Sequence, residues 1–401
     1  MNDIKESLLM IPSGIKEGKL YSFRPNDGTG DFTVDRNSTA TYIDEDGILK
    51  TALANEVRFD WSTGVPVILR ELQSTNLIPY SKDFSQWELG GGNLTTSNGK
   101  IYETTQDGQH RFRILSNVDI GTYTQTIFIK DFELTDRYIA LYPQGSAIGG
   151  AQYIIFDLNT DTITKKTSNI EGRIYNKGQY KVLELTYTVT SAGTWFSHLY
   201  FSNSPTSPSA FYVGDSSKFI EVVGFQLEAG STASSYIPTA GVTETRLEDL
   251  VVDAGDSTTF NSEEGVLFVE MAALSNDSTN NYITISDGTS SNRIILRYVN
   301  GDRINIYMTN DNGGLLSLNN YTDITETKKI AVKWSQDSVS FWDNGVKVGE
   351  SLSFNTFSIN TLNVIDLASH TYSLPIYAKI KQLKVFKTAL TDQQLTDLTT
   401  L

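Results

Sequence analysis

The chain has 401 residues, and at roughly 100–200 residues per domain this length predicts two to four domains. Asp and Glu outnumber Lys and Arg by 47 to 32, which gives a net charge of -15; the acidic excess is spread along the chain, so nucleic acid is excluded as an expected partner. Cysteine is absent, and this excludes disulfides, thiolate metal sites and cysteine nucleophiles.

The three histidines, His110, His198 and His370, stand far apart in the sequence, so no short-range histidine pair is available to hold a metal. We expect them to be ordinary surface or loop residues. No GxSxG, HExxH, P-loop or GxGxxG motif occurs. The apolar run at residues 8–12 is too short for a secretory leader, and no run approaches the roughly 18 apolar residues of a membrane helix. The sequence therefore predicts a chain with no signal peptide and no membrane insertion.

Composition divides the chain into four stretches. Residues 1–75 are turn-rich and only weakly periodic, and residues 76–239 contain roughly eight or more short strands. Residues 240–257 form an acidic, linker-like stretch, and residues 258–401 are a second run of alternating strands ending in one short helix. Many short strands with regular turns are typical of sandwiches and jelly rolls. The predicted fold class is therefore all-β: two tandem β-sandwiches of jelly-roll type, preceded by an irregular N-terminal region.

Period-two alternation of apolar and polar residues marks individual strands. It is clear at residues 183–189, 304–308 and 330–334, where it places one face of each strand in a core. Two further alternating runs flank Asn344-Gly345, and this dipeptide supplies the positive φ angles of a type I′ turn. The sequence therefore predicts a tight hairpin at residues 338–348.

Helical signals are confined to the C-terminal end of the sequence. Thr391 and Gln394 have the spacing of a capping box, which predicts the start of one short helix there. No heptad stretch occurs, so any fibre-like assembly must be built from β surfaces rather than from a coiled coil.

Several short segments are more specific than the general all-β pattern. Together they resemble a family of tailed-phage virion proteins, in which a short N-terminal attachment region precedes a jelly roll similar to carbohydrate-binding modules. The resemblance covers about residues 10–240. The segments that carry it are residues 11–14 (IPSG), 19–22 (KLYS), 30–41 (GDFTVDRNSTAT), 58–61 (RFDW), 72–77 (LQSTNL), 80–87 (YSKDFSQW), 226–230 (QLEAG) and 235–239 (SYIPT).

Residues 258–401 are similar to laminin-G/concanavalin-like sandwiches. The similarity is carried by residues 332–334 (VKW), 341–345 (FWDNG) and 380–386 (IKQLKVF), the last followed by Leu390-Thr391. The resemblance implies a fibre, spike or decoration protein on the surface of a phage particle, with a head fibre of a crAss-like phage as one placement; head and tail positions both stay open. It also implies that residues 1–75 attach the chain to other virion proteins, and that the protein is an oligomer, with a trimer favoured.

Binding of host or mucus glycans would require an exposed aromatic ring on which the C–H face of a sugar can pack. In the middle domain the candidates are Trp87, Tyr102, Tyr142 and Trp195, with Trp195 first because it follows a turn at the start of a strand. In the last domain Trp342 is the candidate, since it faces the opposite side from Phe341. The alternative for each ring is the commoner one, since an aromatic residue in a β-sandwich is usually a core residue or a tyrosine that fixes a turn. The acidity of the chain disfavours direct capture of anionic glycans unless a cation bridges them.

Calcium is the cofactor that laminin-G-like folds imply, and it requires several oxygen ligands. The best local clusters are residues 44–47 (DEDG), with Asp44 and Asp46, and residues 310–313 (NDNG), with Asp311. Neither matches the DxDxDG loop, and such strings are also ordinary turn sequences.

The sequence does not favour an enzyme. A retaining glycosidase needs two carboxylates about 5–5.5 Å apart, and no pair on one strand face fits, because Glu263 and Glu264 point to opposite faces and Glu270 stands alone. Three hypotheses remain. The first is a non-enzymatic virion appendage that binds glycans, the second is a purely structural decoration protein without a ligand, and the third, ranked lowest, is a polysaccharide-degrading spike.

Overall fold

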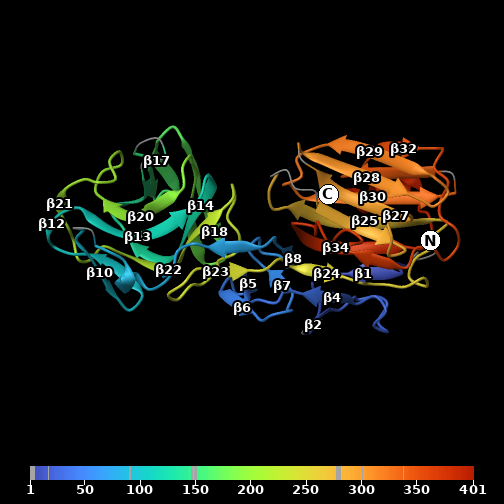
Figure 1. Ribbon diagram of the computed structural model, residues 1–401, viewed down its shortest axis with the longest axis horizontal. Coiled ribbons are helices and arrows are strands. Elements are labelled where there is room, and N and C mark those ends of the chain that lie inside the picture. The colour runs from blue at the N-terminus through green and yellow to red at the C-terminus, as the bar shows by residue number, and fades with distance from the viewer. Residues whose placement is uncertain are drawn as a thin grey trace. The chain divides into compact units, whose positions relative to one another are not determined.

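The structure is a computed structural model that describes residues 5–16, 18–89, 92–145, 148, 151–276, 281–299, 301–336 and 338–401. These residues are almost entirely β (Figure 1), with strands β1–β34, a short 3-10 helix η1 (Phe84–Gln86) and the α-helix α1 (Asp392–Thr399). The predicted all-β fold class is confirmed. Among the described helices, none has the length and apolar character to span a membrane.

The chain forms two compact units. Unit 1 comprises Met1–Glu45, Lys50–Gln73 and Leu247–Leu401, and unit 2 comprises Asp46–Leu49 and Ser74–Arg246. Unit 1 is therefore built from both ends of the sequence, with the chain of unit 2 inserted between its parts.

The main sheet of unit 1 has eight antiparallel strands. Its strands, in order, are β32 (Val346–Ser351), β31 (Ser338–Asp343), β30 (Lys328–Ser335), β25 (Gly265–Ala273), β34 (Ala378–Phe386), β8 (Val67–Arg70) and β7 (Arg58–Asp60), with β1 (Leu8–Met10) also paired to β34. One edge of β34 pairs with β25, while its other edge pairs with β8 through Ile380 and with β1 through Leu383. Strands from the first part of the sequence are thus integral to this sheet.

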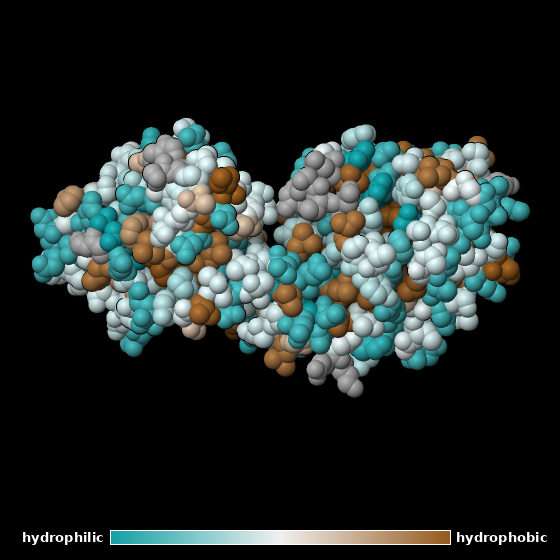
Figure 2. All heavy atoms as spheres, in the orientation of Figure 1, coloured by the Kyte–Doolittle hydropathy of each residue, from teal (hydrophilic) through white to brown (hydrophobic). Residues whose placement is uncertain are grey.

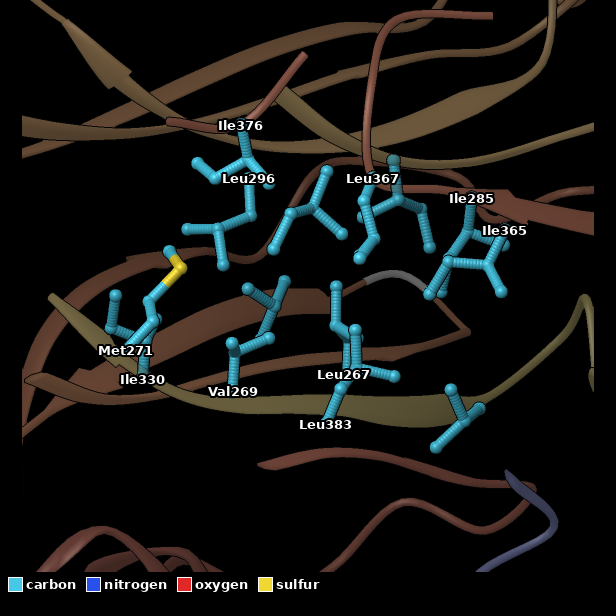
Figure 3. Close-up of a cluster of buried hydrophobic side chains, with 14 of the residues drawn as sticks. Leu267, Val269, Met271, Ile285, Leu296, Ile330, Ile365, Leu367, Ile376 and Leu383 are labelled. Carbon is cyan, nitrogen blue, oxygen red and sulfur yellow. The ribbon is translucent and has the colours of Figure 1, made fainter. Parts of the chain in front are cut away.

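A second, five-stranded sheet packs against the main sheet to form a sandwich. Its strands, in order, are β29 (Leu315–Tyr321), β28 (Arg303–Thr309), β27 (Arg293–Val299), β26 (Asn281–Ser286) and β33 (Val364–Asp366). Figure 3 shows the core between the sheets, where Leu267 and Val269 of β25 and Leu383 of β34 point toward Leu296 of β27 and Ile365 of β33. Each such fully buried aliphatic side chain stabilises the fold by roughly 1.5–3 kcal/mol.

Helix α1 covers the outer face of the main sheet over β30, β31 and β32. Its capping box is present as predicted, because Thr391 Oγ1 accepts from the Gln394 N–H and the Gln394 side chain accepts from the Thr391 N–H. Leu395 is fully buried against the sheet. The predicted hairpin is also confirmed: β31 and β32 are joined by Asn344 and Gly345 with φ angles of 48° and 83°, the positive values that a type I′ turn requires.

Smaller sheets complete unit 1. They are β2 (Ile15–Lys16), β3 (Lys19–Leu20), β4 (Phe32–Asp35) and β24 (Leu250–Val252), in that order, and the hairpin of β5 (Ala40–Ile43) and β6 (Leu49–Ala52). Beside β24, the buried Asp249 carboxylate accepts from the guanidiniums of Arg36, at 2.7 Å, and Arg58, while its backbone carbonyl accepts from Arg70. Arg58 is also paired with the buried Glu71 at 2.6 Å. Four segments distant in sequence are thereby joined by one buried ionic network.

Unit 2 is a second sandwich of two antiparallel sheets. The six-stranded sheet contains, in order, β10 (Leu94–Ser97), β11 (Lys100–Glu103), β22 (Phe219–Ala229), β14 (Gly121–Glu133), β19 (Tyr180–Val189) and β18 (Ile170–Lys177). The five-stranded sheet contains β13 (His110–Val118), β20 (Gly193–Ser202), β15 (Tyr138–Gln144), β16 (Ile154–Asp157) and β17 (Thr162–Lys166). Two short pairs accompany them, namely β12 (Asp107–Gly108) with β21 (Tyr212–Val213), and β9 (Ser74–Asn76) with β23 (Glu244–Arg246). The predicted inward face of residues 183–189 lies in the core between the two larger sheets.

These units divide the chain differently from the four predicted stretches. Residues 1–75 do not form a separate irregular region, because β1, β7 and β8 are strands of the main sheet of unit 1. Residues 240–257 are not a free linker either, since they contain β23 and β24, and Val251 and Asp249 are buried. The physical reason is that short strands with distant partners have weak local periodicity, so composition alone makes them resemble loops.

Candidate functional site

The outer face of the five-stranded sheet of unit 2 gathers aromatic and basic side chains. Residues of β13, β20 and β15 that point away from the core stand in register, and one row runs Arg113–His198–Tyr142 across the three strands. The neighbouring rows place Arg111 beside Tyr200, and Leu115 beside Phe196. We call this surface the aromatic face; its members are Arg111, Arg113, Leu115, Tyr142, Tyr153, Phe196, His198 and Tyr200.

Ring packing holds the aromatic face together. The Tyr142 ring centroid lies 5.7 Å from that of His198, 5.9 Å from that of Tyr153 and 6.1 Å from that of Tyr200. On the other side of His198, the Phe196 ring is 5.7 Å away. Tyr142 and Phe196 are only partly buried, so each of these two rings offers some solvent-accessible apolar surface beside the buried His198. Figure 2 shows hydrophobic residues gathered over β13 and β20.

The two arginines of the aromatic face are fixed in place. Arg111 donates from Nη1 to the Tyr200 hydroxyl at 2.7 Å, and the Arg113 guanidinium lies 4.2 Å from the Phe196 ring centroid. Arg113 also forms an ion pair with Glu88 at 2.8 Å, and the side chains of Arg113 and Glu88 are 28% and 53% exposed. The rings are thus bordered by solvent-accessible donors and acceptors that can bind hydroxyl groups.

His198 lies at the centre of the aromatic face and is completely buried. Burial, together with the nearby Arg111 and Arg113 guanidiniums, lowers the pKa of His198 to about 3, so the imidazole is neutral. Within the described part of the chain, neither ring nitrogen has a hydrogen-bond partner. His110 is also fully buried, stacked on Tyr212 with ring centroids 4.4 Å apart. The expectation that the histidines are surface or loop residues is wrong for these two, which stand in strands.

One side of the aromatic face is bordered by the loop that follows β20. The Tyr153 hydroxyl donates to the carbonyl of Thr206 at 3.2 Å, and the Ser202 hydroxyl donates to that of Ser207 at 2.6 Å. This loop leaves Tyr142, Phe196 and Leu115 partly or fully accessible, with Leu115 42% exposed. The accessible part of the face is therefore on the β13 side and around Tyr142.

Two predicted sugar-binding residues of unit 2 are core residues. Trp195, the first candidate, is 3% exposed and points into the sandwich on the opposite side of β20 from Phe196. Gly145 closes over it so tightly that a Cβ at this position would lie 1.5 Å from the indole ring. Trp87 is 4% exposed, packs on Phe225 with ring centroids 4.8 Å apart, and donates from Nε1 to a backbone carbonyl. Neither ring is an exposed platform.

Trp342, the candidate of the last domain, is not an exposed platform either. It does face the opposite side of β31 from Phe341, as predicted, but helix α1 covers that side and leaves Trp342 1% exposed. The ammonium groups of Lys333 and Lys347 lie 5.7 and 5.4 Å from its ring centroid, and both lysines pair with Asp392 of α1. The ring is thus part of the contact that holds the helix on the sheet.

The two tyrosine candidates remain partly accessible. Tyr142 belongs to the aromatic face, and burial with the neighbouring Tyr200 and Tyr153 raises its pKa. Tyr102 lies on β11 of the other sheet, where its ring is 5.5 Å from that of Phe219. The structure therefore brings Tyr142 together with other rings on an extended face, while Tyr102 forms a single pair.

The predicted calcium ligands do not form a cluster. Asp44 lies 3.5 Å from Lys50 across the β5–β6 hairpin, and Asp46 and Asp311 are exposed turn residues. Throughout the described ranges, no three His, Asp or Glu side chains come together in a way that could hold a metal ion. The acidic strings are accounted for by turn formation.

Sequence reasoning missed Phe196, His198 and Tyr200 together with their arginine partners. Residues 195–201 read WFSHLYF, so both faces of the strand carry large apolar or aromatic groups, and alternation alone does not say which face is buried. The signal that could have found the site is the pair Arg111 and Arg113, since arginines at alternate positions of a strand mark its solvent side.

No family model matches the chain, and no curated protein matches it in sequence. Among solved structures, the carbohydrate-binding module CBM40 of the Ruminococcus gnavus IT-sialidase is similar, with 15% identity and a TM-score of 0.31 over 36% of this chain and 86% of that one. Domains LG4-5 of the mouse laminin alpha1 chain match at 10% identity and a TM-score of 0.24 over 74% of this chain and 92% of that one. The tail fibre protein gp63.1 of an E. coli phage matches at 10% identity and a TM-score of 0.21 over 80% of this chain and 40% of that one. We base the proposed function on the geometry of the aromatic face rather than on these similarities.

Proposed function

We propose that the chain is a non-enzymatic adhesion protein whose unit 2 binds a glycan on the aromatic face. The observation that carries this proposal is that two partly accessible rings, Tyr142 and Phe196, pack on either side of His198, with the Arg113 guanidinium over the Phe196 ring. Sugar rings pack their C–H faces on aromatic rings, while their hydroxyls bind to charged and amide groups at the border. The aromatic face offers both kinds of contact on a rigid sheet.

The side chains of the aromatic face are already ordered in the absence of a ligand. Tyr142 is packed between Tyr153 and His198, and the Arg113 guanidinium is held over Phe196 by its ion pair with Glu88. A ligand therefore does not have to order these side chains, and this lowers the entropic cost of binding. Because Glu88 is paired with Arg113, it serves in this proposal as a hydrogen-bond acceptor and not as a general acid.

In the same proposal the protein is a virion surface component of a bacteriophage, made in the host cytoplasm and assembled as a homotrimer. Its support is the resemblance of residues 10–240 to tailed-phage virion proteins. In this proposal unit 1 as a whole, rather than residues 1–75 alone, attaches the chain to other virion proteins. The reason is that β1, β7 and β8 are strands of the main sheet of unit 1. Several copies on one particle would raise the strength of weak single-site binding. Light scattering of the purified protein would test the trimer, and labelling of intact particles would test its place on the virion.

A glycan array with wild type and three variants tests the binding site. Tyr142→Ala and Phe196→Ala remove one accessible ring each, and we expect each to weaken binding roughly two- to twelvefold, since such a ring contact contributes about 0.5–1.5 kcal/mol. Tyr102→Ala is the matched control, because it removes a partly buried tyrosine from the other sheet of the same unit. Thermal unfolding of each variant would show that unit 2 still folds.

The outcomes separate the alternatives. Loss of binding in Tyr102→Ala, with Tyr142→Ala and Phe196→Ala unchanged, would move the site away from the aromatic face. No glycan bound by wild type, with binding to purified capsid or tail retained, would favour a purely structural decoration protein. Release of reducing sugars from host polysaccharide would favour a degrading spike and contradict a non-enzymatic role.

A further inference from the structure

Unit 1 also has a sheet face with polar side chains, on the outer side of β26, β27, β28 and β29. The inward residues of these strands, such as Leu296 and Ile306, belong to the core. The residues between them point outward, and one row runs Tyr282–Arg297–Asn305–Asn319 directly across the four strands. The next outward row includes Tyr307, and Arg293 and Arg303 stand in the flanking rows. We call this surface the arginine face.

Arg297 stands in the central row of the arginine face, between two tyrosine rings. Its guanidinium is 5.6 Å from the ring centroid of Tyr282 and 5.3 Å from that of Tyr307. Nε donates to Asn305 Oδ1 at 2.7 Å, and Nη1 donates to the Tyr282 hydroxyl at 3.1 Å. Asn305 is in turn fixed by donating to the Ser317 hydroxyl at 2.9 Å. The direction of the Arg297 guanidinium is therefore determined before any ligand binds.

Three arginines of this face contact rings and polar groups rather than carboxylates. Arg293 lies 5.6 Å from the Tyr307 ring centroid and bonds to His370 at 3.3 Å, and Arg303 lies 6.0 Å from the Tyr321 ring centroid. In the described part of the chain, neither these two nor Arg297 forms an ion pair with a carboxylate. This is a local exception in a protein with a net charge of -15, so the overall charge gives no indication of it.

The spacing of the positive groups suits a repeating anionic chain. Arg293 and Arg297 are four residues apart on one strand, which separates them by roughly 13 Å at about 3.3 Å per residue. Arg303 is offset from Arg297 by one strand and two residues, a diagonal of roughly 7–8 Å. Guanidinium groups bind carboxylate and sulfate with two parallel hydrogen bonds. The tyrosine rings and the exposed amide of Asn319 provide the contacts that a sugar ring and its hydroxyls require.

We propose that the arginine face binds an acidic polysaccharide, a chain of sugars bearing carboxylates or sulfates. This site lies in unit 1 and is distinct from the aromatic face, on which unit 2 is proposed to bind a glycan. A protein with both sites would bind glycans through two separate faces.

The test uses the full-length protein and four probes, measured by isothermal titration at low and at physiological salt. The probes are oligogalacturonate, which carries carboxylates, a chondroitin sulfate oligosaccharide, which adds sulfates, neutral maltohexaose, and single-stranded DNA of matched charge. We expect one or both acidic oligosaccharides to bind, and binding to weaken with added salt, because the contacts are ionic. Which of the two binds more tightly assigns carboxylate or sulfate as the preferred group.

Three variants locate the site. Arg297→Gln should weaken binding of the acidic oligosaccharide at least tenfold, and Arg303→Gln several-fold; the latter keeps the Arg297–Asn305 contacts intact and so guards against misfolding. Arg24→Gln is the matched control, because it removes an arginine charge from an exposed position of unit 1 that is paired with Glu6, and it should bind like wild type.

Four results would overturn the proposal. They are no binding of either acidic oligosaccharide, equal binding of maltohexaose, equal binding of the DNA, and equal weakening by Arg24→Gln. Because Tyr142→Ala and Phe196→Ala leave unit 1 unchanged, loss of glycan binding on the aromatic face in those variants would not affect this result.

Discussion

His198 is a buried neutral base, and this has a measurable consequence for stability. The unfolded chain binds a proton on this imidazole below its ordinary pKa of 6.5, whereas the folded protein does so only near pH 3. As the pH falls from 6.5 toward 3, the unfolded state therefore binds more protons than the native state, and the free energy of unfolding decreases. One such group contributes a slope of at most about 1.4 kcal/mol per pH unit.

Replacing His198 by phenylalanine removes this dependence and keeps a ring in the aromatic face. In His198→Phe, the stability relative to wild type should rise as the pH is lowered from 7 to 5, measured by urea unfolding at each pH. His370→Phe is the control, because His370 is a partly buried histidine outside the aromatic face. A wild-type protein and a His198→Phe variant with parallel pH profiles would contradict the assignment of a depressed pKa.

Individual residues also show which features could be predicted from the sequence and which could not. Asn344-Gly345 and the Thr391–Gln394 capping box were predictable because each is a local signal whose partner lies within a few residues. Trp195 was assigned to the wrong side of its strand because residues 195–201 are apolar on both faces. The covering of Trp342 depends on where α1 packs, and this is decided by tertiary contacts rather than by alternation.

At the scale of elements, the buried carboxylate of Asp249 holds together strands that composition separates. It accepts from Arg36 and Arg58 and from the backbone N–H of Glu71, at the junction of β7, β8 and β24. Asp249→Asn removes the carboxylate charge that the buried Arg36 and Arg58 guanidiniums share, and removal of one partner from such a network costs about 3–5 kcal/mol. We expect a matching fall in the chemical unfolding midpoint of unit 1.

Glu248→Gln provides the control for Asp249→Asn, since the neighbouring residue loses the same charge at an exposed position. Its effect should stay within about 0.5 kcal/mol. Equal unfolding midpoints for the two variants would show that the ionic network contributes little to holding β7, β8 and β24 together.

At the scale of the whole molecule, the two units differ in how their chains are arranged. Apart from the short Asp46–Leu49 turn, unit 2 is one continuous stretch, Ser74–Arg246, whereas unit 1 draws strands from both sides of it. A fragment of residues 74–246 should therefore fold alone, with cooperative thermal unfolding and dispersed amide NMR signals. A fragment of residues 247–401 should not, because it lacks β1, β7 and β8 as partners of the main sheet and the arginines that pair with Asp249. Cooperative unfolding of residues 247–401 alone would contradict this view of unit 1.

The pairing of β34 with β25 on one edge and with β1 and β8 on the other also fixes an order of events during synthesis. Strands β1 and β8 leave the ribosome early, but their partner β34 emerges only after all of unit 2 has been translated. Until then these nascent segments expose unpaired backbone and apolar side chains, such as Leu8 and Ile68, that end up fully buried. The early part of the chain is thus the part that most needs the protection of a chaperone while the rest is being made.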